Sequence, residues 1–235
     1  MMVKDFESKC LTVIIPCFNE EKTIREVLVK VLKQSQVGEV IVIDDCSTDS
    51  SVEKIRLIKD DRVQLCINEQ NYGKGKSIWR GIKLAQLKYL IIQDADLEYD
   101  PDEYSSLMRT IIENSADAVY GSRFLTSGPR RAVYFWHRIG NFLLTTTSNA
   151  FTNVYLTDME TGHKLLRTAI AKQLNLKENR FGVEPEITAK LARLDARIYE
   201  VPIKYNARTY AEGKKIGWKD GFSALRCIIK YSIVK

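Results

Sequence analysis

Four acidic side chains crowd into one short stretch of the sequence, IIQDADLEYD, which spans residues 91–100. They are Asp94, Asp96, Glu98 and Asp100. Like charges this close raise one another's pKa values unless a cation or a hydrogen-bond network compensates them. The stretch is therefore either a site that takes up a cation or a polar turn before a helix that begins near Pro101.

Two further stretches place polar side chains after apolar runs. IIPCFNEE, residues 14–21, ends on Asn19 and Glu20, and VIDDCSTDSS, residues 42–51, contains Asp44 and Asp45. Alone, the first could be an acid favoured by a helix dipole and the second a capped helix start. Together with the acids at 94–98, they indicate a ligand site.

The elements that must position these residues alternate along the first half of the chain. Apolar runs at 11–18, 39–44, 63–68, 89–94 and 116–122 predict strands, and helical periodicity at 24–32 and 104–112 predicts amphipathic helices. This order favours an α/β fold with a mostly parallel sheet and helices on both faces. Ligands bind such sheets beyond the carboxyl ends of the strands. The three acidic stretches are therefore expected at one edge.

The second half of the chain is less regular. We expect a helix at about 131–154, a second helix near 185–194 and a late strand within 196–205. No repeat or linker is evident. The sequence predicts one domain over residues 1–217, followed by a C-terminal helical segment at 218–235.

Bulk composition limits the possible classes of protein. The 235 residues are 45% hydrophobic and 28% charged, with a net charge of +6 that favours anionic partners. Five scattered cysteines without CxxC spacing indicate neither disulfides nor a zinc site, and favour a reducing, cytosolic compartment. No apolar run approaches the roughly 18 residues that a membrane span requires.

Six motifs resemble one enzyme family. PCFNE, VIDDCSTD and QDADLEYD resemble the nucleotide-sugar-binding half of family 2 inverting glycosyltransferases with the GT-A fold, which is Rossmann-like. YGSRF (120–124), TDMETGHKLLR (157–167) and RTYAEGKKIGWKDG (208–221) resemble the dolichol-phosphate and polyprenol-phosphate sugar synthase branch. The resemblance implies transfer of mannose or glucose, with inversion, from a GDP- or UDP-hexose to a polyprenyl or dolichyl phosphate.

The resemblance also assigns residues to roles. The nucleotide-sugar would contact Pro16, Phe18, Glu20, Asp44, Asp45, Asp94, Lys214 and Lys215. A divalent cation, Mg²⁺ or Mn²⁺, would bind Asp94, Asp96 and Glu98, whose hard oxygen ligands suit these ions. The acceptor phosphate would contact Arg123, Arg131, His137 and Arg138. Asp96, Arg123 and Arg208 would be catalytic, with Arg208 and the two lysines closing over the diphosphate.

Other functions remain open at this point. NYGKGKS, residues 71–77, ends like a phosphate-binding P-loop, but that motif requires glycine at position 70, where this chain has Gln70. A nucleic-acid-binding module would explain the positive charge but not the acids at three strand ends, so no nucleic-acid partner is expected. A nucleotide-sugar sensor would not need Arg123. A soluble family 2 glycosyltransferase with a sugar or protein hydroxyl acceptor would need a general base, for which Glu184 and Glu186 are the nearest candidates.

Two stretches suggest contact with a membrane surface. YFWHRIGNFLL, residues 134–144, places aromatic side chains beside Arg138. The tail carries an apolar stripe with basic neighbours, formed by Trp218, Phe222, Leu225 and Ile229. Such helices can lie flat in a membrane interface, although packing on the protein core would give the same pattern. We expect a peripheral protein on the cytoplasmic face of a membrane.

Overall fold

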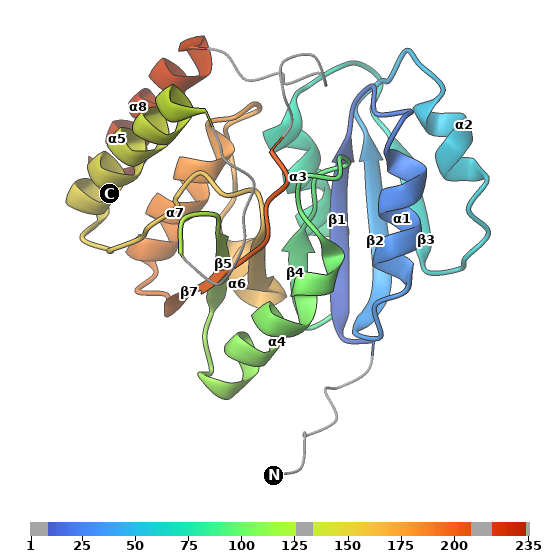
Figure 1. Cartoon of the computed structure of the whole chain (residues 1–235), viewed down its shortest axis with the longest axis horizontal. Helices are drawn as coiled ribbons and strands as arrows, with labels where there is room; N and C mark the ends of the chain where they lie inside the picture. The colour runs from blue at the N-terminus through green and yellow to red at the C-terminus, as the bar shows by residue number, and fades with distance from the viewer. Residues whose placement is uncertain (1–8, 126–133, 208–217, 234–235) are drawn as a thin grey trace.

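The computed structural model describes residues 9–125, 134–207 and 218–233 (Figure 1). Its centre is a sheet of seven strands in the order β3-β2-β1-β4-β6-β5-β7. The strands are β1 (Leu11–Cys17), β2 (Val37–Asp44), β3 (Val63–Ile67), β4 (Tyr89–Ile92), β5 (Ala118–Ser122), β6 (Lys164–Arg167) and β7 (Ile198–Pro202). The predicted mostly parallel sheet is confirmed, and the predicted strand segments form every strand except β6.

One strand departs from the parallel arrangement. β6 lies between β4 and β5 and runs antiparallel to both, whereas β1 pairs with β2 and β4 in parallel. The sequence analysis did not predict β6. Its four residues include only two apolar side chains, Leu165 and Leu166, which is too short a run to show a strand period.

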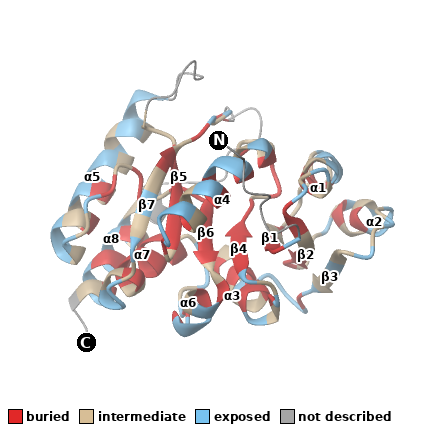
Figure 2. Ribbon diagram, turned by 90° about the horizontal axis from the view of Figure 1, so that it is seen from below, coloured by how far each residue is buried: buried red, intermediate tan, exposed pale blue. Residues whose placement is uncertain are grey.

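Helices cover both faces of the sheet. They are α1 (Ile24–Leu32), α2 (Ser51–Arg56), α3 (Lys74–Leu84), α4 (Tyr104–Glu113), α5 (Phe135–Thr152), α6 (Thr168–Gln173), α7 (Val183–Arg193) and α8 (Trp218–Ile233), with a short 3₁₀ turn at Pro101–Glu103. Buried residues of α1, α2 and α4 pack on one face, and those of α3, α6 and α7 on the other. Figure 2 shows these buried residues in the strands and on the inner sides of the helices.

Helix α8 is anchored on the outer side of α7. It buries Ala224, Cys227, Ile228 and Tyr231. Glu178 binds three side chains of this helix, namely Arg226 at 2.6 Å, Lys230 at 3.0 Å and the Tyr231 hydroxyl at 2.9 Å. Burial raises the pKa of Glu178, but these hydrogen bonds outweigh it and lower the pKa to about 2. Within the described residues, none of the helices is both long and apolar enough to cross a membrane.

Candidate active site

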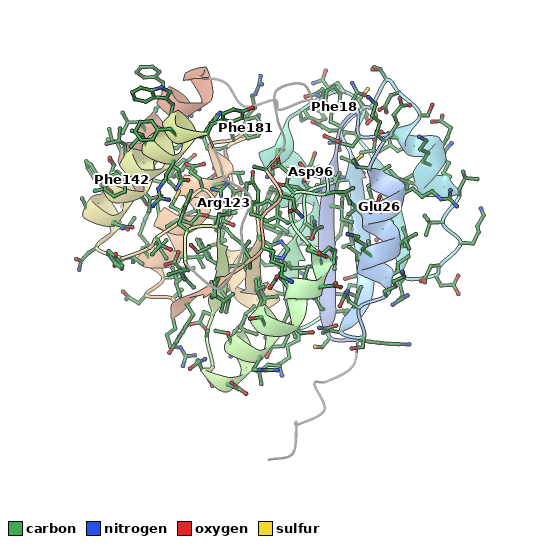
Figure 3. The ribbon with its side chains drawn as sticks, in the orientation of Figure 1. Phe18, Glu26, Asp96, Arg123, Phe142 and Phe181 are labelled. Atoms are coloured by element: carbon green, nitrogen blue, oxygen red, sulfur yellow. The ribbon has the colours of Figure 1, made fainter. Side chains whose placement is uncertain are left out.

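The carboxyl ends of β1, β2 and β4 meet at one edge of the sheet. Cys17 at the end of β1 pairs in register with Asp44 at the end of β2, and Ile14 pairs with Ile92 at the end of β4. Asp94 and Asp96 follow β4 by two and four residues, and Figure 3 shows Phe18 and Asp96 toward the same end of the sheet. The expectation that the acidic stretches share one edge is confirmed.

The loops after β1 and β2 are tied to each other. The Asn19 backbone N–H donates to Ser47 Oγ at 3.0 Å, and the Glu20 N–H donates to Ser51 Oγ at 2.9 Å. In return, Asn19 Oδ1 accepts the Thr48 N–H at 2.8 Å. The two motifs that the sequence analysis assigned to nucleotide binding therefore form one rigid wall, which includes the half-buried Pro16 and Phe18.

Asp44 and Asp45 have different surroundings. Asp44 is fully buried and its Oδ2 accepts the Ser47 N–H at 2.9 Å, while its Oδ1 has no hydrogen-bond partner among the described residues. Asp45 accepts the backbone N–H groups of Tyr72 at 3.0 Å and Gly73 at 2.6 Å. Asp45 thus shapes the turn before α3, whereas Asp44 keeps a buried oxygen that a ligand could use.

The three predicted metal ligands do not converge on one point. Asp94 Oδ1 pairs with Lys74 Nζ at 2.7 Å, Asp96 Oδ1 accepts the Glu98 N–H at 3.0 Å, and Glu98 Oε2 accepts the Tyr205 hydroxyl at 2.8 Å. Across residues 9–125, 134–207 and 218–233, no group of three or more metal-binding side chains is assembled. A fully protein-built cation cage is therefore absent from this part of the chain. Carboxylate oxygens at this edge still suit Mg²⁺, which typically takes one or two carboxylates together with substrate phosphates.

Arg123 is engaged by a residue that the sequence analysis missed. Its Nε and Nη2 donate to Asp158 at 2.7 Å each, and its backbone N–H donates to the same carboxylate at 2.9 Å. The guanidinium also lies 5.2 Å from the ring centre of Tyr205. Burial lowers the pKa of Arg123, but the charge of Asp158 outweighs it and holds the pKa well above its ordinary value. Arg123 is therefore a permanent, oriented cation.

The segment after Asp158 closes against the acidic edge. The Gly162 N–H donates to the Tyr99 hydroxyl at 3.0 Å, and a Cβ at Gly162 would lie 2.8 Å from Asp94 Oδ2. His163 is fully buried, stacks 5.3 Å from Tyr99 and 5.6 Å from Tyr104, and its ring nitrogens have no partner among the described residues. Burial lowers the pKa of His163 to about 4, so the ring is neutral at pH 7.

Both carboxylates considered as general bases are engaged in ion pairs, although Glu184 Oε1 accepts no hydrogen bond from the described residues. Glu184 pairs with Lys164 and lies 3.5 Å from Lys74 Nζ. Glu186 accepts the backbone N–H groups at positions 177 and 178 and pairs with Lys190 at 2.6 Å. A third carboxyl group, Glu160, was not predicted, and burial raises its pKa to about 7.

A comparison with protein families decides the class of the protein. Residues 12–174 match the family model described as Glycosyl transferase family 2, which covers more than half of the chain. The chain belongs to glycosyltransferase family 2. It is a glycosyltransferase, as the sequence motifs predicted.

Curated relatives and solved structures agree with this assignment. The glycosyltransferase is 28% identical over 231 residues to a UDP-N-acetylglucosamine–dolichyl-phosphate N-acetylglucosaminyltransferase of Methanococcus voltae, covering 88% of this chain and 91% of the relative. It is 26% identical over 225 residues to a dolichol-phosphate mannosyltransferase of Pyrococcus furiosus, covering 94% of this chain and 63% of the relative. Its structure superposes on glucosyl-3-phosphoglycerate synthase from Mycobacterium tuberculosis in complex with UDP, with a TM-score of 0.72, 18% identity and coverage of 97% of this chain and 81% of the other. The predicted GT-A fold is confirmed.

The remaining predicted site residues of the glycosyltransferase lie on α5 or beyond the described part. His137 and Arg138 are in the first turn of α5, where the Arg138 guanidinium lies 5.8 Å from the ring centre of Phe124. Phe124 directly follows Arg123. The first turn of α5, which carries Arg138, therefore lies next to the segment after β5, which carries Arg123. Outside the described residues lie Arg131, Arg208, Lys214 and Lys215.

Proposed function

We propose that this glycosyltransferase moves a hexose from a nucleotide-diphosphate sugar to a polyprenyl or dolichyl phosphate, with inversion at the anomeric carbon. The two relatives named for dolichyl-phosphate substrates support this acceptor class. The observation that carries the proposal is the engagement of Glu184 and Glu186 in ion pairs. A hydroxyl acceptor gains about 10²- to 10⁴-fold from a general base, whereas a lipid phosphate is already ionised at pH 7 and can attack without one.

The donor would bind at the acidic edge of the sheet. The wall formed by Pro16, Phe18 and Glu20 would contact the base and ribose. Asp44 Oδ1, which has no hydrogen-bond partner among the described residues, would accept a hydrogen bond from one of them. Mg²⁺ or Mn²⁺ would be held by Asp96 with Asp94 or Glu98, and diphosphate oxygens would complete its coordination. When bound, the cation would stabilise the negative charge that develops on the departing diphosphate.

The acceptor phosphate would meet the charge of Arg123. Asp158 holds the guanidinium through two hydrogen bonds, so the cation is oriented before the acceptor arrives. His137 and Arg138 extend the basic region along α5. We infer that Arg123 orients the lipid phosphate and that the Asp158 carboxylate positions Arg123.

A membrane surface would present this lipid, and two neighbouring helices would contact it. Figure 1 shows α5 and α8 side by side at one end of the molecule. They expose Phe135, Trp136 and Phe142 from α5 and Phe222 from α8, with exposed fractions of 65%, 78%, 62% and 68%. Phe142 points outward from α5 in Figure 3. Exposed aromatic side chains beside basic ones favour a helix pair that lies in the interface, and we infer peripheral attachment at the cytoplasmic face.

The acceptor assignment is tested by direct competition. The purified protein is offered UDP- and GDP-hexoses with Mg²⁺ and equal amounts of a polyprenyl phosphate and the matching free polyprenol. We expect a product from the phosphate only. Turnover of the alcohol or of simple sugars, without turnover of the phosphate, would refute the proposed acceptor.

A hydroxyl acceptor has one supporting observation, which is the pKa of about 7 at Glu160. A carboxyl group with this pKa could accept a proton near neutral pH. Glu160→Gln separates the two functions, because it should abolish transfer to a hydroxyl but leave transfer to a lipid phosphate within a few-fold of wild type.

Membrane attachment is tested with vesicles of phosphatidylcholine and phosphatidylglycerol at low salt. We expect the protein to float with the vesicles and Trp136→Ser to weaken this binding. Leu57→Ser is the control, since Leu57 is 67% exposed but follows α2 at the other end of the molecule. Equal binding by both variants, or no binding by wild type, would contradict the assignment of this face.

A further inference from the structure

Four charged side chains of alternating sign lie in contact behind the acidic edge. Asp94 Oδ1 is 2.7 Å from Lys74 Nζ, and the same ammonium is 3.5 Å from Glu184 Oε1. The other oxygen of Glu184 binds Lys164, whose ammonium also donates to the carbonyl of Met159 at 3.0 Å. The charges therefore run from Asp94 through Lys74 and Glu184 to Lys164.

These four residues come from four different elements. Asp94 follows β4, Lys74 begins α3, Glu184 is in the first turn of α7, and Lys164 begins β6. Lys164 is completely buried, and the Glu184 side chain is only 5% exposed. A buried charge that loses its partner is strongly destabilising, so each member depends on its neighbours.

Lys74 is the member of this charge network whose position is least favourable without its neighbours. It occupies the first position of α3, where the helix dipole disfavours a cation. Its ammonium instead lies between two carboxylates, Asp94 at 2.7 Å and Glu184 at 3.5 Å. Two carboxylates therefore hold an ammonium where the helix alone would not.

The glycines on either side of Lys74 allow the start of α3 to pack closely against the segment that precedes α7. A Cβ at Gly73 would lie 2.5 Å from the carbonyl oxygen of Asn179, and one at Gly75 would lie 2.2 Å from that of Glu178. Gly73 also has a φ of 100°, which L side chains rarely adopt. The glycines of NYGKGKS thus allow close packing against residues 178–179, which places Lys74 within reach of Glu184.

We propose that Glu184 is a positioning residue of the donor site, which holds the Lys74 ammonium against Asp94. The Glu184 carboxylate lies between the ammonium groups of Lys74 and Lys164 and contacts both of them. Without that carboxylate, the Lys74 ammonium loses one of the two anions that hold it, whatever the charge at position 164, and it moves away from Asp94. Asp94 then loses its compensating charge and its orientation beside Asp96, and an anionic diphosphate binds less well. The effect on the donor rests on the proposed function.

The experiment compares Glu184→Gln with Glu186→Gln. Both remove a buried, ion-paired glutamate of α7, but Glu186 pairs with Lys190 rather than Lys74. In Glu186→Gln the amide oxygen can still accept the N–H groups at positions 177 and 178, so the segment that packs on α3 keeps these bonds. Thermal midpoints are measured without ligand and with UDP or GDP in the presence of Mg²⁺. We expect both variants to melt earlier, whereas only Glu184→Gln should weaken nucleotide binding, by about tenfold or more.

A double variant separates positioning from stability. Lys164→Met combined with Glu184→Gln removes both the buried cation and its anion, so the ligand-free midpoint should recover toward wild type. The nucleotide response should stay weak, because Lys74 still lacks Glu184. If Glu184→Gln alone does not melt cooperatively, this double variant carries the nucleotide measurement.

Two results would overturn the proposal. One is a nucleotide response of Glu184→Gln equal to that of Glu186→Gln, and the other is full recovery of the response in the double variant. If wild type responds to neither nucleotide, the donor assignment fails instead. The contact is then tested in ligand-free protein, where fully additive midpoint losses for Lys74→Met and Glu184→Gln would overturn it.

Discussion

Replacing Arg123 by Ala should destabilise the protein as well as impair acceptor use. The substitution leaves the Asp158 carboxylate, whose side chain has no exposure, without the two 2.7 Å hydrogen bonds from the guanidinium. Removing one partner of a buried ion pair costs about 3–5 kcal/mol. The backbone N–H of residue 123 still donates to Asp158, so we expect a loss near the lower bound, about 3 kcal/mol. For a chain of this size, that lowers the thermal midpoint by about 6–12 °C.

The matched control is Arg197→Ala. Arg197 also pairs with an aspartate, Asp117, at 3.3 Å, but its side chain is 57% exposed. Exposed pairs contribute about 0–1 kcal/mol, so this midpoint should fall by no more than about 4 °C. Differential scanning calorimetry measures both variants. A difference of about 2 °C in midpoint corresponds to at most about 1 kcal/mol for a chain of this size. An Arg123→Ala midpoint within about 2 °C of the control's midpoint would therefore refute the structural role of the pair.

The acceptor role of Arg123 is then measured below the melting transition. Arg123→Lys keeps a charge but cannot form the two parallel hydrogen bonds to Asp158. We expect both Arg123 variants to lose lipid-phosphate turnover while nucleotide binding changes little. A parallel loss of nucleotide binding would show that the substitution acts through the fold rather than on the acceptor.

The other predictions concern residues near the acidic edge. His163→Phe removes two buried nitrogens without partners in the described residues and should stabilise the protein by about 1–2 kcal/mol in urea unfolding at pH 7. The folded pKa of about 4 lies below the ordinary value of about 6.5, so wild-type stability should fall as pH drops from 6.5 toward 4, and His163→Phe should reduce this loss; an unchanged pH profile would contradict the assignment. Gly162→Ala places a methyl group 2.8 Å from Asp94 Oδ2 and should weaken nucleotide-induced stabilisation more than it lowers the ligand-free midpoint; the reverse order would count against this contact. Asp96→Asn should fold normally but lose most transfer activity, whereas near-normal turnover that also survives EDTA would exclude a metal role for Asp96.

The grouping of acidic residues at one edge of the sheet could be predicted because each apolar run and the acids that follow it are adjacent in the sequence. The central parallel strands β1 and β4 are buried on both faces and read as continuous apolar runs, such as residues 89–92. The acids that follow such runs must share an edge once the strands are parallel. Asp44, Asp94 and Asp96 could therefore be placed together before any coordinates were known.

The pairing of charges could not be predicted in the same way. Asp158 and Arg123 are 35 residues apart, and nothing local in either motif shows that they meet. Lys74 was considered only as part of a phosphate-binding loop, and its contact with Asp94 depends on how α3 packs on β1 and β2. The antiparallel insertion of β6 brings Lys164 to Glu184, and that strand was too short to be recognised.

Glu178 connects the outer helix to the interior of the protein. Its side chain accepts hydrogen bonds from Arg226 and Lys230 of α8. Its backbone carbonyl packs so closely on Gly75 that a methyl group at position 75 would not fit. The next residue, Asn179, accepts the Lys76 N–H at 3.1 Å. A displacement of α8 would therefore act, through Glu178 and Asn179, on the start of α3, where Lys74 lies. If α8 rests on a bilayer, membrane tension or curvature would shift Lys74 through this segment. The affinity for the nucleotide donor would then depend on the state of the lipid surface.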